Sequence, residues 1–284
     1  MEYMDEEIVY YSELIPASKW GDDLVMLDTD INLLSGTDFD DTGHKLINID
    51  PQQMGFFEDF MRYQIQLVTN KTLLDLSMYH NEINDDEHKQ VLNSMPYKSD
   101  IMPNFGRYIE TVVSDILHED VKIFNNDIWI RICRPSNEAA VVPDDFNPCH
   151  RDVYLDFYRN IVNIYIPIVG SNEKSSLAVN SGSHKWNENI TRVTSGGAFF
   201  PSTNKKYSVD AIVASKVALD MIRPNPIAPT QMLLFSPYLI HGCASNLNAN
   251  MTRFSVEIRF IRRDENGAKQ EAVFREFLKT RTWR

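Results

Sequence analysis

NPCHRDVYL, at residues 147–155, is the stretch around which the other segments of the chain can be placed, together with LLFSPYLIHGCASN at residues 233–246. In an extended strand the side chains at positions i and i+2 point to the same face, so His150 and Asp152 can enter one pocket. His241 would reach that pocket from a neighbouring strand. Two imidazoles and one carboxylate on one side of a metal ion leave the opposite positions open, which is typical of non-heme Fe(II) oxygenases. We therefore expect these three side chains to bind iron.

Segments with strand patterns surround this motif. Residues 160–170 form a β-branched and aromatic run typical of a buried strand, and residues 229–237 predict another. Residues 248–260 alternate between polar and apolar side chains, so the two kinds occupy opposite faces of a strand. The polar face comprises Arg253, Ser255, Glu257 and Arg259. Together with the alternating segment at residues 121–133, these strands predict a β core over about residues 121–262.

The metal motif and these strands resemble the phytanoyl-CoA dioxygenase-like family of Fe(II)/2-oxoglutarate-dependent oxygenases. The resemblance spans roughly residues 145–262, and Ser181 stands where that family usually has Pro. The matching segments are His150–Asp152, Ile164–Pro167, Leu177–Lys185, Leu233–Asn246 and Thr252–Arg253. The resemblance implies an α+β fold, with a double-stranded β-helix (jelly-roll, cupin-like) core and flanking α-helices.

We expect a single domain over residues 1–284, because 43% hydrophobic residues suffice for a substantial core. Its N-terminal part, about residues 1–120, would combine loops with helices, since apolar residues recur at helical spacing in residues 51–74 and 104–119. A C-terminal amphipathic helix is predicted at about residues 266–280.

The family resemblance also implies 2-oxoglutarate as co-substrate and O2 as oxidant. This keto-diacid chelates iron at one end, and its far carboxylate requires a buried cation, for which the forked guanidinium of Arg is suited. Arg253 stands where the family places that Arg, and Ser255 on the same face can add a hydroxyl; Arg259 ranks second. Asn163 lies in an apolar run and needs a hydrogen-bond partner if buried, which could be the co-substrate carboxylate or a backbone group.

Candidate substrate residues lie at the start of the β core. Trp129 and Arg131 share one face of the segment at residues 121–133. If that face borders the iron, the two side chains offer a ring and a cation to a substrate; the alternative, an outer face packed on a helix, is equally consistent with the pattern. Asn147 can reach the co-substrate, although Asn before Pro is also typical of a turn.

The remaining histidines have other expected roles. His80 and His88 lie in a polar segment without an acidic partner at ligand spacing on a strand, so they are predicted to face solvent. The resemblance assigns His184 a structural role. Residues 185–222 separate the two halves of the metal motif and are expected to form a mobile lid or a specificity element over the pocket.

The resemblance implies that an unactivated C–H bond of a small-molecule metabolite is hydroxylated, with succinate and CO2 as co-products. Asp152 favours hydroxylation over halogenation, because halogenating relatives are expected to replace this carboxylate with a small residue. Two other classes stay open: a cupin-like metalloenzyme or zinc hydrolase that does not use 2-oxoglutarate, and a non-catalytic metal-binding protein of the same fold. A small polar metabolite or a natural-product intermediate is the expected substrate, and an acyl group on a carrier is the alternative.

Charge and composition limit the partners. The net charge of −12 and the pI near 5.0 argue against binding to a nucleic-acid backbone, since such binding depends on Lys and Arg that neutralise phosphates. No stretch approaches the ~20 apolar residues of a membrane span. The three cysteines form no CxxC pair and no even framework, which favours a reducing compartment, and we expect a cytoplasmic protein.

Overall fold

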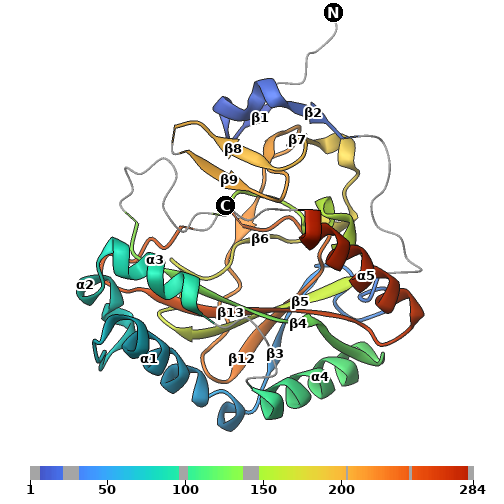
Figure 1. Ribbon diagram of the computed structural model, residues 1–284. Helices are drawn as coiled ribbons and strands as arrows, with labels where there is room; N and C mark the ends of the chain where they lie inside the picture. Colours follow the sequence, from blue (N-terminus) through green and yellow to red (C-terminus); the bar gives the residue numbers. More distant parts are fainter. Residues whose placement is uncertain are drawn as a thin grey trace, which may run out of the picture.

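The centre of the protein is a five-stranded antiparallel sheet (Figure 1). The structure is a computed structural model that describes residues 7–21, 32–95, 102–136, 147–202, 204–242 and 245–280. In spatial order the strands are β3 (His44–Asn48), β12 (Gln231–Phe235), β5 (Ile161–Val169), β13 (Arg253–Arg262) and β4 (Val121–Cys133). β13 lies between β5 and β4, and its Val256 is opposite Ile166 on one side and Ile130 on the other.

Four helices cover one face of this sheet (Figure 1). They are α1 (Phe56–Thr69), α2 (Tyr79–Glu82), α3 (Asp85–Ser94) and α4 (Pro103–Leu117). α3 begins at a capping box, in which the Asn84 side chain accepts from the first turn and Glu87 accepts from the Asn84 N–H. α4 begins with Pro103, whose fixed φ and missing N–H suit the first helical position. The helices predicted from residues 51–74 and 104–119 are therefore present.

Alternation along the strands decides which side chains meet the helices. Phe254, Val256, Ile258 and Phe260 of β13 are fully buried in the main apolar core with the four helices. Ile128, Ile130 and Ile132 of β4 join the same core. Since successive residues point to opposite faces, Trp129 and Arg131 lie on the face away from the helices. This resolves the alternative that the sequence left open.

A second, four-stranded sheet lies across from that other face (Figure 1). Its order is β1 (Ile8–Val9), β10 (Ile212–Ser215), β7 (Thr191–Thr194) and β2 (Ser18–Trp20). Two short antiparallel pairs accompany it: β8 (Ala198–Phe200) with β9 (Lys205–Tyr207), and β6 (Val179–Asn180) with β11 (Met221–Ile222). Of the two expectations for residues 185–222, the mobile lid is wrong, because this segment supplies the strands β7 to β11 and buries all four residues of β10; the specificity element stays a prediction.

The last helix, α5 (Glu265–Thr280), lies on the opposite side of the main sheet from α1 and α4 (Figure 1). Its Phe274 packs with Phe124, Phe157 and Tyr158 in a separate aromatic cluster. The 3-10 helices are η1 (Ser12–Ala17), η2 (Pro51–Gln53), η3 (Leu76–Met78), η5 (Asp152–Tyr154), η6 (Asp156–Tyr158), η7 (Ser183–Lys185) and η8 (Glu188–Ile190). Among the described residues no helix is long and apolar enough to cross a membrane.

Two expectations about single residues are wrong. His88 is buried rather than solvent-facing, with its Nδ1 3.0 Å from the Tyr79 hydroxyl, because α3 turns this face toward the core. His80 is half-buried, with its Nδ1 3.0 Å from the Thr252 hydroxyl. Cys149 is disulfide-bonded, which does not favour the reducing compartment that the cysteine spacing indicated.

Candidate metal centre

His150 and His241 are held opposite each other by the backbone. They form an isolated antiparallel bridge, in which each residue's N–H donates to the other's carbonyl at 3.0 Å. Gly242 follows with a φ of +96°, and a Cβ at this position would lie 2.6 Å from the Pro148 carbonyl oxygen. Only glycine therefore allows the two segments to approach this closely.

Asp152 does not continue an extended strand after His150. It begins the 3-10 helix η5, so the expectation of a strand through both residues is wrong. The turn nevertheless brings its carboxylate beneath both rings: Asp152 Oδ1 lies 3.5 Å from His150 Nε2 and 3.9 Å from His241 Nε2. Within the part of the chain that the structure describes, this is the group of side chains whose ligand atoms could hold a metal ion, all within 4.8 Å of one another.

Backbone carbonyls orient both imidazoles. His150 Nδ1 is 2.7 Å from the Pro148 carbonyl oxygen, and His241 Nδ1 is 2.9 Å from that of Leu239. Because a carbonyl can only accept, each Nδ1 carries the proton and each Nε2 keeps a lone pair for a cation. These are the tautomers that metal ligation through Nε2 requires.

The surroundings of the site also set the protonation states of His241 and Asp152 in a way that suits cation binding. Burial lowers the pKa of His241 to about 4, and the neighbouring His150 adds to the lowering. Burial by itself raises the pKa of Asp152, but the Arg259 guanidinium and the two histidines together hold it well below its usual range. Near neutral pH the site therefore offers a neutral His241 imidazole and a carboxylate.

Two side chains from the main sheet hold the Asp152 carboxylate. Asn163 on β5 donates its Nδ2–H to Oδ2 at 3.0 Å, and Arg259 on β13 lies 3.4 Å from both oxygens. The Arg259 guanidinium also stacks 4.6 Å from the centroid of the Tyr158 ring. Asn163 was expected to meet a co-substrate or a backbone group, and its amide N–H instead orients the candidate ligand. Among the described residues its Oδ1 is buried without a hydrogen-bond partner.

Arg151 anchors the segment from the opposite side. This fully buried side chain pairs with Glu188 at 2.7 Å and donates to the carbonyl oxygens of Ser183 and Trp186. It points away from the two ligands that flank it in sequence. The ion pair therefore connects the start of η5 to η8, which precedes β7, and it fixes the backbone that carries His150 and Asp152.

Arg253 is buried on the metal side of β13, at 6% exposure. Its guanidinium donates to the Ser175 carbonyl oxygen and to Cys133 Sγ, and lies 5.9 Å from the Tyr165 ring centroid. Burial lowers the pKa of Arg223, and the positive charge of Arg253 lowers it further, so two guanidinium groups converge here. Two neighbouring cations in a buried setting favour an anionic ligand.

Ser255 and Glu257 continue this face of β13 toward the histidines. The Ser255 hydroxyl is fully buried, and no hydrogen-bond partner reaches it among the described residues. Glu257 accepts from Arg131 at 3.0 Å; although burial raises its pKa, Arg131 and Arg259 lower it more, so it is a carboxylate. Alternation along β13 predicts that Glu257 lies on this face, but it does not give the distance from Glu257 to the candidate ligands, so no role was predicted for it.

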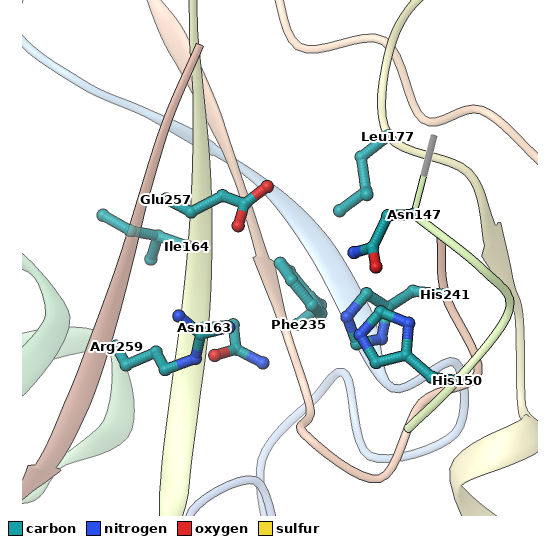
Figure 2. Close-up of a pocket in the computed structure, with 9 residues that line it drawn as sticks. All are labelled: Asn147, His150, Asn163, Ile164, Leu177, Phe235, His241, Glu257 and Arg259. Carbon is teal, nitrogen blue, oxygen red and sulfur yellow. The ribbon is translucent and has the colours of Figure 1, made fainter. Parts of the chain in front are cut away.

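Two cavities meet at the candidate ligands. A narrow one of about 20 Å³ lies between the histidines and β13, lined by Asn163, Glu257 and Arg259 among others (Figure 2). A larger one of about 460 Å³ is lined by His150 and Asp152 on one side. The three residues expected to meet a substrate, Trp129, Arg131 and Asn147, all line this larger cavity.

No protein-family model and no curated protein matches this chain. Among solved structures, the chain is similar to EctD from S. alaskensis with bound Fe, at 13% identity and a TM-score of 0.46, covering 92% of this chain and 85% of that one. AviO1 from Streptomyces viridochromogenes Tue57 matches at 13% identity and a TM-score of 0.45, covering 84% and 96%. The epimerase SnoN in complex with Fe3+, alpha ketoglutarate and nogalamycin RO matches at 8% identity and a TM-score of 0.43, covering 79% and 80%.

Proposed function

We propose that this protein is an Fe(II)- and 2-oxoglutarate-dependent oxygenase of the phytanoyl-CoA dioxygenase-like family. The observation that carries the proposal is the convergence of His150, Asp152 and His241 beside a sheet face that carries a buried Arg253. The facing five-stranded and four-stranded sheets are consistent with a double-stranded β-helix core in one domain.

The donor set fits a ferrous ion. Two buried imidazoles with unprotonated Nε2 atoms and one carboxylate make a facial set that leaves positions for further ligands. Asn163 and Arg259 would keep the Asp152 carboxylate oriented when the ion binds. The ion would supply the redox chemistry that couples decarboxylation of 2-oxoglutarate to oxidation of a substrate C–H bond.

Arg253 and Ser255 support 2-oxoglutarate as co-substrate. A dianion needs cations in a buried setting, and the adjacent guanidinium groups of Arg253 and Arg223 supply two. The Ser255 hydroxyl on the same face can donate a further hydrogen bond to a carboxylate. These side chains would bind and orient the far end of the keto-diacid, while the fully buried strand residues around them exclude water.

The proposed reaction consumes 2-oxoglutarate, O2 and a substrate C–H group, and releases succinate, CO2 and the hydroxylated product. The larger cavity beside His150 and Asp152 would hold the substrate, with Trp129, Arg131 and Asn147 in its wall. One oxygen atom of O2 enters succinate and the other enters the product, so no further reductant is required.

Anaerobic titration tests this proposal. Addition of Fe(II) and then 2-oxoglutarate should produce a weak visible charge-transfer band, and the Asp152→Ala variant should not form it. A cupin-like enzyme that does not use 2-oxoglutarate would bind the metal without the band. A non-catalytic protein would form no succinate in air, and either result would overturn the proposal.

A further inference from the structure

The size and the lining of the larger cavity indicate what kind of substrate it can hold. It has a volume of about 460 Å³, within the range of pockets that enclose drug-sized ligands. His150 and Asp152 form part of its wall, so a molecule inside it lies against the candidate metal ligands. Arg131 and Arg259 also line the cavity.

Another part of the wall is apolar and comes from two segments that are distant in sequence. Its members are Leu155, Phe157, Tyr158, Phe274, Phe277 and Leu278. The Phe157 ring lies 4.9 Å from that of Phe274 and 4.6 Å from that of Phe277, centroid to centroid. These contacts fix the wall as part of a packed aromatic cluster.

Helix α5 presents two of these side chains to the cavity without burying them. Phe277 and Leu278 pack against the cluster but are only half-buried, whereas Phe274 is buried in it. Val273 of the same helix is 54% exposed and does not line the cavity. When an apolar group of a ligand covers such a partly open apolar surface, apolar area is removed from water, which favours binding.

We propose, building on the oxygenase function above, that the substrate is an amphiphile whose apolar ring system or chain lies against this α5 wall while its reacting carbon faces His150 and Asp152. Of the two substrates expected from the sequence, a small polar metabolite would leave the wall in contact with water, whereas a natural-product intermediate with an apolar part would cover it. Lys206 of β9 lines the same cavity and can meet an anionic or polar end of the molecule.

Binding of the fluorescent amphiphile 8-anilinonaphthalene-1-sulfonate tests the wall directly. Titrated into folded protein, with and without Fe(II) and 2-oxoglutarate, it should bind at one site. Phe277→Ala removes a ring from the wall and should weaken binding at least fivefold. Val273→Ala truncates an exposed side chain on the same helix and should change the affinity less than twofold.

Phe277 also contacts Phe157, so its truncation can disturb the aromatic cluster. Leu278→Gln is therefore a second variant: Gln has a helix propensity similar to that of Leu, and the substitution changes the polarity of the wall. Unfolding by urea shows whether each variant is folded. Unchanged affinity in folded Phe277→Ala or Leu278→Gln, or an equal loss in Val273→Ala, would overturn the inference. Failure of the wild type to form the Fe(II)/2-oxoglutarate band would instead reject the proposed function, and the dye titration would still decide whether the wall binds apolar molecules.

Discussion

Replacement of His241 by Gln should remove a pH dependence of stability that burial creates. The pKa of His241 is about 4 in the folded protein, against an ordinary value of 6.5. As the pH falls below 6.5, His241 becomes protonated in the unfolded chain but stays neutral in the folded protein. The folded state therefore loses stability relative to the unfolded state. This loss grows until the pH reaches the folded pKa and then stops.

The magnitude follows from the two pKa values. Between pH 7.5 and pH 5.5 the linkage relation gives a loss of about 1.3 kcal/mol from His241 alone, and below pH 4 the full loss is about 3 kcal/mol. The free energy of unfolding should therefore fall by about 1.3 kcal/mol more in the wild type than in His241→Gln over this interval. The histidines distant from the site are common to both proteins, so their contributions cancel, whereas His150 is coupled to His241 and the comparison reports the pair.

Urea unfolding of metal-free protein in the presence of a chelator measures this difference at the two pH values. The chelator matters because a bound cation would stabilise the folded state and hide the titration. An equal pH dependence in wild type and variant would refute the reasoning, since it would mean that His241 is not held neutral by its surroundings.

Three further changes test the site. Arg253→Lys keeps the charge but loses the planar fork, so the dissociation constant of 2-oxoglutarate, followed by the charge-transfer band, should rise about tenfold or more, and an unchanged value would argue against this Arg as its ligand. Glu188→Gln leaves the Arg151 charge buried without its carboxylate and should lower the free energy of unfolding by about 3 kcal/mol; a loss under about 1 kcal/mol in urea would contradict the role of this ion pair. Asn163→Ala removes a donor to Asp152 and should weaken Co(II) binding, measured by absorption titration, about tenfold to a hundredfold, whereas equal affinity would show that the amide does not position the carboxylate.

Local pattern predicted four strands of the main sheet, β4, β5, β12 and β13, and together with the family resemblance it predicted that the three candidate ligands meet, but it did not predict β3. Alternation assigned Arg253 and Ser255 to one face of β13, because one face of that strand had to meet the apolar core. The continuous apolar run of β5 predicts a strand that is buried on both faces, and nearly all of its residues are buried in this way. The path between His150 and Asp152 was not predictable, since a 3-10 turn and a strand both bring these two side chains together.

The second sheet and the cavity wall depend on contacts between distant segments. β7 and β10 are four residues long and of mixed composition, so they give no strong signal until they pair with each other. Phe277 and Leu278 belong to an amphipathic helix, and its sequence does not show whether the apolar side meets a core or a cavity. His88 is buried because Tyr79 offers its ring nitrogen a hydroxyl partner, which no spacing rule reveals.

Succinate release from 2-oxoglutarate is the measurement that tests the central claim most directly. Wild-type protein reconstituted with Fe(II) in air should convert 2-oxoglutarate to succinate, and Asp152→Ala under the same conditions should give only the rate of free Fe(II). Wild-type protein that binds Fe(II) but forms no succinate above that background, or an Asp152→Ala variant that forms as much, would contradict the account.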